Sequence, residues 1–278
     1  MSRPHMSDRL PADQLLELAT FTKKLAQAAS EATLPYFRQQ IAVDDKIGKP
    51  GFDPVTEADR GAERAMRALI EAHYPDHGII GEEYGEKKSK SGPIWVLDPV
   101  DGTRAFVAGL PSWGTLIALN DGDQPVIGAV AQPYIGELFL GIHGSGISRA
   151  HLNDKPIQCR PCKSLDRAIL STTGVNFLSP LEQAAFKILE RSAPITRYGF
   201  DCYAYAVLAL GMIDLVVEAG LETYDVQALI PLIRGAGGVI TGWRGDDAQA
   251  GGRVIAAGDA DLHHLVLDHL RDVPNNPS

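Results

Sequence analysis

Two aspartates, Asp98 and Asp101, stand three residues apart in an Asp-Pro-Val-Asp-Gly run that directly follows the apolar residues 95–97. The proline has no amide hydrogen and the glycine allows a backbone path that other residues resist, so an expected strand ends here in a tight turn. Both carboxylates and the carbonyl of Val100 can therefore face one ion. Magnesium prefers such oxygen ligands, at about 2.0–2.1 Å. The run favours a magnesium site in which Asp98 bridges two ions, although the same residue types also make plain turns.

Two further acidic positions follow apolar residues elsewhere in the chain. Glu82 comes after Ile79, Ile80 and Gly81, and Asp225 ends another apolar run at the expected start of a helix. Each position also has a simpler explanation, since an acid at a helix start complements the helix dipole. It is the combination with the aspartate pair that predicts one shared metal site.

An attacking water molecule would need orientation and a proton acceptor. Thr103 could orient the water, and Asp59 is the carboxylate available to take its proton. Amides around Gly102 and Thr103 could donate hydrogen bonds to phosphate oxygens. Two structural alternatives stay open: Thr56 to Asp59 matches a helix capping box, and the Thr103 hydroxyl can bond to the local backbone.

The elements that must position these residues alternate between helices and strands. Apolar residues at helical spacing predict one helix over residues 15–29, ending near Pro35, and a second from after Thr56 to before Pro75. Between them, the charged residues 44–53 predict a mobile surface loop. Short apolar runs predict a meander of strands at 94–97, 115–119, 126–131 and 137–142.

The second half of the chain continues this alternation. Strands are expected at 169–171, 215–218, near 239 and at 254–257, with helices at 181–191, 203–210 and 226–234 and one more at the end. The mixture predicts an α/β or α+β fold in a single domain, residues 1–278. A soft division is expected between an N-terminal part, 8–150, with most of the metal ligands, and a C-terminal part, 151–272, that completes the metal and substrate site.

The composition excludes several classes of protein. The chain has 278 residues, 45% of them hydrophobic, which is enough for a sizeable core. A net charge of −9 without a basic cluster argues against nucleic acid or an anionic membrane as the main partner. The three cysteines, Cys159, Cys162 and Cys202, are too few for a disulfide framework, and no apolar run has the length of a membrane span or signal peptide. These features predict a cytoplasmic protein.

Several segments resemble the inositol monophosphatase family: residues 53–59, 81–83 and 95–106. Residues 224–228 and 235–238 resemble the C-terminal signature in altered form, with Tyr-Asp where the common version has Trp-Asp. The resemblance implies a layered α/β/α/β/α sandwich of the inositol monophosphatase and fructose-1,6-bisphosphatase type. It also implies a homodimer that uses Mg²⁺, is sensitive to lithium and hydrolyses a small phosphorylated metabolite.

The same resemblance implies roles for individual residues. Glu82, Asp98 and the carbonyl of Val100 would hold a first Mg²⁺. Asp98, Asp101 and Asp225 would hold a second, and Glu82 would also support a weaker third. Thr103 and Asp59 would activate water for in-line attack on phosphorus, with no covalent enzyme intermediate. The segment 44–53 would close over the metals or carry part of the third metal site, although its two lysines are equally consistent with solvated surface charge.

The choice of substrate depends on positions that depart from the commonest family pattern. Residues 102–106, 111–116, 198–205 and 224–225 are similar to the histidinol-phosphatase branch of the family. Histidinol phosphate carries an ammonium and an imidazole group, so its pocket should contain carboxylates that do not bind metal. Asp201 and Glu218 are the candidates, with Asp201 the sharper one.

Alternatives to these substrate roles stay open. Asp201 could instead cap the helix that follows it, and Glu218 occupies the position that contacts substrate hydroxyls in inositol phosphatases. Arg104 could bind phosphate, together with Gly102 and Thr103, or pair with a carboxylate across a dimer interface. The rival functions are an inositol-preferring or broad monophosphatase, a bisphosphatase for a sugar or nucleotide, and a catalytically idle metal-binding regulator.

Overall fold

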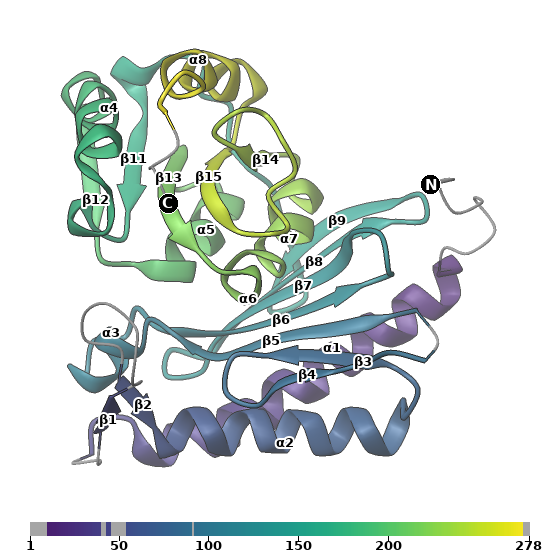
Figure 1. Ribbon diagram of the computed structural model, residues 1–278. Helices are drawn as coiled ribbons and strands as arrows, with labels where there is room; N and C mark the ends of the chain where they lie inside the picture. The colour runs from purple at the N-terminus through teal and green to yellow at the C-terminus, as the bar shows by residue number, and fades with distance from the viewer. Residues whose placement is uncertain (1–9, 40–42, 46–53, 91, 275–278) are drawn as a thin grey trace.

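Helices and sheets alternate in layers through the molecule (Figure 1). The computed structural model describes residues 10–39, 43–45, 54–90 and 92–274. Two long helices lie under a large sheet, shorter helices fill the space between this sheet and a second one, and two more helices cover the outer face of the second sheet. This is the expected α/β/α/β/α sandwich, so the predicted fold is confirmed.

The first layer consists of α1 (Ala12–Thr33) and α2 (Glu57–His73). Both form because apolar side chains recur at helical spacing, and these are the side chains that are buried against the first sheet, as Leu18 and Leu25 are on α1 and Met66 is on α2. The predicted helix over residues 15–29 is therefore correct but short by about one turn at each end. The helix α2 begins directly after Thr56, as predicted.

The first sheet is built mainly from a meander. Among the described residues it has eight strands in the order β10-β9-β8-β7-β6-β5-β3-β4, in which β3 runs parallel to β5 and the other neighbours are antiparallel. Their bounds are β3 (Gly78–Gly81), β4 (Gly85–Lys87), β5 (Ile94–Asp101), β6 (Gly114–Asn120), β7 (Pro125–Gln132), β8 (Glu137–Gly144), β9 (Ile147–Leu152) and β10 (Lys155–Ile157). The predicted meander is confirmed, and β9 and β10 extend it.

The second sheet mixes parallel and antiparallel pairs. In the described part of the chain its strand order is β12-β11-β13-β15-β14, with β11 parallel to both of its neighbours. The strands are β11 (Ile169–Thr172), β12 (Ile195–Tyr198), β13 (Leu215–Leu221), β14 (Val239–Gly242) and β15 (Gly252–Ala257). The parallel pairs arise because α4 (Pro180–Ser192) and α5 (Asp201–Ala209) connect these strands as crossovers.

Two short helices, α6 (Thr223–Val226) and α7 (Leu229–Gly235), join α5 between the sheets, and α8 (Ala260–Leu270) packs beside α4 on the outside (Figure 1). A helix was expected from residue 226 to about residue 234; α7 confirms it over residues 229–234, but its start is wrong by three residues. Pro231 has no amide hydrogen for the carbonyl four residues earlier, so the helix is interrupted at residues 227–228. One buried apolar cluster includes side chains of both sheets and of α5 and α7, and it ties the two halves together.

Near the pocket, two short elements differ from expectation. Residues 44 and 45 belong to β1 (Val43–Asp45), which pairs with β2 (Pro54–Thr56) in antiparallel orientation. The predicted loop therefore begins inside a strand. The rest of that loop, 46–53, lies outside the described residues. The helix α3 (Thr103–Val107) was not predicted. No helix in the described part of the chain is long and apolar enough to cross a membrane.

Candidate metal and substrate site

A pocket of about 800 Å³ opens where the carboxyl end of β5 meets α5, α6 and the end of β13. Its wall contains nearly every residue that the sequence singled out: Glu82, Asp98, Val100, Asp101, Gly102, Thr103, Arg104, Asp201, Glu218 and Asp225. Asp59 does not line the pocket, but it lies in the first turn of α2, and its charge helps to raise the pKa of Asp98. Residues from across the chain, 82 to 225, thus converge on one site.

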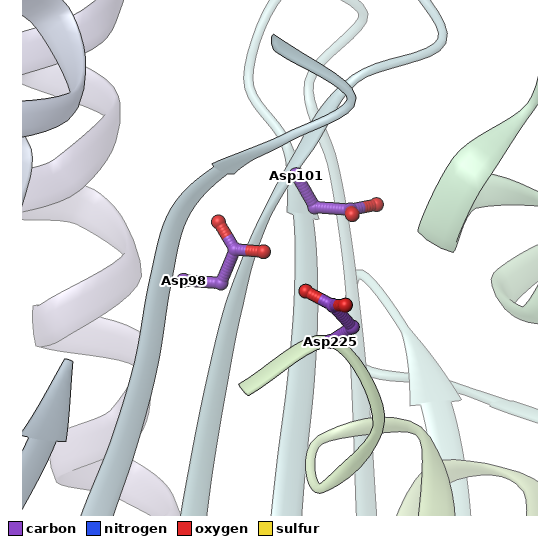
Figure 2. Close-up of side chains that lie close together, drawn as sticks. All are labelled: Asp98, Asp101 and Asp225. Atoms are coloured by element: carbon purple, nitrogen blue, oxygen red, sulfur yellow. The ribbon is translucent and has the colours of Figure 1, made fainter. Parts of the chain in front are cut away.

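The side chains of Asp98, Asp101 and Asp225 point toward one another (Figure 2). One carboxylate oxygen of each lies within 4.8 Å of the corresponding oxygens of the other two. Asp98 is only 2% exposed, and its Oδ1 has no hydrogen-bond partner among the described residues. Such a buried, clustered set of carboxylate oxygens matches the ligand preference of a hard divalent cation such as Mg²⁺.

Backbone amides hold two of these carboxylates in place. The amide of Cys202, in the first turn of α5, donates to Asp101 Oδ2 at 2.6 Å. The amide of Glu222 donates to Asp225 Oδ2 at 2.7 Å, just before α6. The ends of α5 and α6 therefore fix the carboxylate directions.

The pKa values of all three aspartates are raised because the carboxylates are buried close to other acids. Burial, then the charge of Glu82, raises the pKa of Asp98 well above its ordinary value. Burial, then Asp201, does the same for Asp101. Burial is also the main cause that raises the pKa of Asp225 to about 7. Since a bound cation would stabilise the ionised forms, this acidic set fits a metal site and is costly without one.

Glu82 occupies the first position of the turn between β3 and β4. Its amide donates to the carbonyl of Leu97 at 3.2 Å, which ties the turn to β5. Glu82 does not belong to the three-carboxylate set within 4.8 Å, yet its charge is the largest one acting on Asp98. Glu82 also raises the pKa of Asp225, so it lies beside the cluster near Asp98 and Asp225.

The hydroxyl of Thr103 donates to the carbonyl of Val100 at 3.0 Å. This is the local backbone bond that was considered as the structural alternative for Thr103. Both residues nevertheless line the pocket. Val100 and Thr103 lie within hydrogen-bond distance because the chain turns sharply between them. Gly102 takes a left-handed conformation there, with φ 81°, and α3 starts directly after β5.

The two candidate substrate carboxylates have different surroundings. Asp201 is the first helical residue of α5, and the N-cap position that the helix-cap alternative requires is occupied by Phe200. Burial raises the pKa of Asp201 to about 6, and the charge of Arg104 acts in the opposite direction. Glu218 is 5% exposed and accepts hydrogen bonds from the amide and hydroxyl of Thr173 and from the hydroxyl of Tyr205.

Arg104 stacks on an aromatic ring of the same chain. Its guanidinium carbon lies 4.8 Å from the ring centre of Phe177, in the one-turn helix η3 (Val175–Phe177). Phe177 and Thr173 belong to the pocket wall but were missed in the sequence, because the loop after β11 carries no charge or periodicity that would mark it. Cys202 was missed for another reason: it acts through its backbone amide, which any residue type supplies.

This chain is similar in sequence and in fold to known proteins of one family. The profile of the inositol monophosphatase family matches residues 14–275. "Bifunctional phosphatase IMPL2, chloroplastic" of Arabidopsis thaliana is 39% identical over 283 residues, which cover 96% of this chain and 80% of that protein. A histidinol-phosphatase of Chlorobaculum parvum is 33% identical over 246 residues, 87% of this chain and 93% of that one. The solved structure of an inositol monophosphatase from Zymomonas mobilis matches with a TM-score of 0.81 at 39% identity, covering 91% of this chain and 97% of that one.

Proposed function

Because the chain belongs to the inositol monophosphatase family, we propose that this metal-dependent phosphomonoesterase hydrolyses L-histidinol phosphate to L-histidinol and inorganic phosphate. The observation that carries the choice of substrate is Asp201, a largely buried carboxylate in the pocket wall outside the three-carboxylate cluster. An ammonium group on the substrate can pair with it through a charge-assisted hydrogen bond. The similarity to a protein named histidinol-phosphatase supports the same choice.

The metal roles in this proposal follow the arrangement of the acids. Glu82, Asp98 and the carbonyl of Val100 would hold one Mg²⁺. Asp98, Asp101 and Asp225 would hold a second, and Glu82 would also serve a weaker third. Bound Mg²⁺ lowers the pKa of a coordinated water and offsets the charge of the phosphoryl oxygens. Thr103 orients the attacking water and Asp59 takes its proton. The amides of Gly102 and Thr103, with Arg104, hold the phosphate oxygens.

Glu218 lines the pocket, where a substrate contact was expected of it, and in this proposal it also supports the pocket wall. Both of its oxygens accept hydrogen bonds, from Thr173 on β11's following loop and from Tyr205 on α5. It therefore joins the loop after β11 to α5 in the pocket wall. Because pocket residues come from both sheets, the whole chain is proposed to act as one catalytic unit. A homodimer, lithium sensitivity and a cytoplasmic location stay predictions.

An inositol phosphate or another small phosphate ester is the second candidate. The observation that favours it is the match to the Zymomonas mobilis inositol monophosphatase over almost the full length of both chains. The metal cluster would serve either substrate, so the two candidates differ only in the alcohol side of the pocket.

The test compares phosphate release from L-histidinol phosphate and from inositol 1-phosphate, each with Mg²⁺ and with a chelator. We expect a higher kcat/KM for histidinol phosphate, lost with the chelator and in an Asp98→Asn variant. Preference for inositol phosphate would overturn the substrate and keep the metal mechanism. Turnover that persists in the chelator and in Asp98→Asn would overturn the mechanism itself.

A further inference from the structure

A fully buried glutamate outside the pocket, Glu63, contacts the turn that carries Glu82. Glu63 lies on α2, one helical turn after Asp59, and its side chain is 0% exposed. Its Oε2 accepts the amide of Glu83 at 2.7 Å and its Oε1 accepts the amide of Tyr84 at 3.2 Å. These are the two amides that directly follow Glu82 in the chain. The Glu63 carboxylate therefore ties the turn to α2 by two hydrogen bonds.

The glycine before Glu82 makes this close approach possible. A Cβ on Gly81 would lie 2.0 Å from Glu63 Oε1, far inside van der Waals contact. Only a residue without a side chain lets the end of β3 pass over the carboxylate at this distance. Gly81 is the last residue of β3, so its backbone conformation does not require glycine. The close contact with Glu63 explains why a glycine stands at this position.

A second residue of α2 donates a hydrogen bond to the residue that follows the same turn. Arg67, one helical turn after Glu63, donates its Nε to Glu63 Oε1 at 2.7 Å. Its Nη2 also donates to the carbonyl of Gly85, where β4 begins. The pair therefore binds the second and third residues of the turn and Gly85 directly after it, and the charge of Arg67 compensates the buried charge of Glu63.

We propose that Glu63 is a positioning residue for metal binding: by holding the amides of Glu83 and Tyr84, it fixes the direction in which Glu82 reaches the metal cluster. The inference rests on the proposed function, in which Glu82 is a metal ligand. It assigns α2 two roles at one site, with Asp59 beside Asp98 and Glu63 behind Glu82. Groups that orient a metal ligand commonly change metal affinity when they are mutated.

The experiment measures Mg²⁺ binding by calorimetry, and activity over a Mg²⁺ titration, in Glu63→Gln. Gln keeps the volume but cannot accept both amides and balance Arg67. We expect the Mg²⁺ dissociation constant to rise about tenfold, the lower end of the range for outer groups of metal sites. The kcat at saturating Mg²⁺ should stay close to that of the parent protein. Gly81→Ala, which displaces the same carboxylate from the other side, should weaken Mg²⁺ binding in the same way.

Glu182→Gln is the matched control, because Glu182 is also a buried helical glutamate that pairs with an arginine and accepts a backbone amide. Its partners are Arg253 at 2.6 Å and the amide of Ser179 at 2.7 Å, and neither residue lines the pocket. This variant should unfold at a lower temperature and bind Mg²⁺ normally. Equal loss of Mg²⁺ affinity in the Glu63 and Glu182 variants would show a general effect of lost stability and overturn the inference.

Glu82→Gln separates this inference from the proposed function. If Glu82→Gln weakens Mg²⁺ binding while Glu63→Gln binds like the parent, the positioning role is wrong and the metal assignment stands. If Glu82→Gln itself binds Mg²⁺ normally, Glu82 is no ligand, and both the assignment and the positioning role fail. Weakened binding in both variants, with a normal Glu182 control, is the expected result.

Discussion

Asp201 combines three features that rarely occur together in one residue. It takes a left-handed backbone conformation, with φ 46°, which aspartate tolerates better than most residues but still at some cost. It is largely buried, and it lies in the substrate pocket without belonging to the acid cluster that suits a metal. Strain of this kind is retained where the surrounding structure requires it, which favours a functional carboxylate.

An Asp201→Asn variant tests that role. A hydrogen bond to a charged group contributes about 1.5–3 kcal/mol, so KM for L-histidinol phosphate should rise by roughly 10–100-fold. Asn keeps the size of the side chain but removes the negative charge and replaces one acceptor oxygen with an NH₂ donor, which cannot pair with the ammonium group. Steady-state kinetics on inositol 1-phosphate provide the control, because that substrate has no ammonium group and its KM should change little. An equal loss on both substrates would contradict an ammonium-specific role.

At the scale of elements, the long periodic segments could be predicted and the short ones could not. The helices α1 and α2 and the strands from β5 to β8 follow apolar periodicity that a single sequence displays. The five-residue α3 is too short to show a period, and its start depends on the backbone angle of Gly102. The parallel placement of β3 beside β5 is a long-range pairing with no local signal.

The candidate site shows the same limit. The acidic residues and their gathering in one pocket could be predicted because carboxylates after apolar runs are conspicuous in a sequence. Glu63 could not, because a glutamate on a helix ordinarily indicates an exposed face. Its burial results from two backbone amides contributed by a turn about twenty residues later.

The junction between β5 and α3 gives a prediction for Gly102. A Cβ at this position would meet the Asp201 side chain at 3.1–3.3 Å, and the φ of 81° is unfavourable for alanine. Gly102→Ala should therefore lose about 1–2 kcal/mol of unfolding free energy from the backbone alone. It should also raise KM, because Asp201 must move. Denaturant unfolding and kinetics measure the two effects.

Gly136→Ala is the matched control for this variant. Gly136 has a similar φ of 73°, and nothing lies within 4 Å of a Cβ built there. It should show the backbone cost and normal kinetics. If Gly102→Ala behaves like Gly136→Ala in both measurements, the contact between Gly102 and Asp201 has no effect on the pocket.

For the whole molecule, the main electrostatic problem is a net charge of −9 combined with buried acids that face one pocket. The fold gathers them from both halves of the chain, so folding itself brings like charges together. In the absence of metal, the raised pKa values of Asp98, Asp101 and Asp225 mean that the folded protein holds protons which the unfolded chain releases near the ordinary aspartate value. Stability and metal binding are thereby coupled.

The sign of this coupling gives the last prediction. Because these folded-state pKa values are raised, the metal-free protein loses stability as the pH rises from the ordinary aspartate range, near 4, to the pKa of about 7 for Asp225. Asp98→Asn removes one buried charge, so in chelator it should be more stable than the parent, and the difference should grow between pH values of about 5 and about 8. Saturating Mg²⁺ should reverse the order, since a ligand at 100 times its dissociation constant adds about 2.7 kcal/mol to the protein that binds it. Urea unfolding of both proteins at the two pH values, with chelator and with Mg²⁺, measures all four differences. A parent protein that exceeds Asp98→Asn in stability at the higher pH in chelator would contradict the repulsion on which this prediction depends.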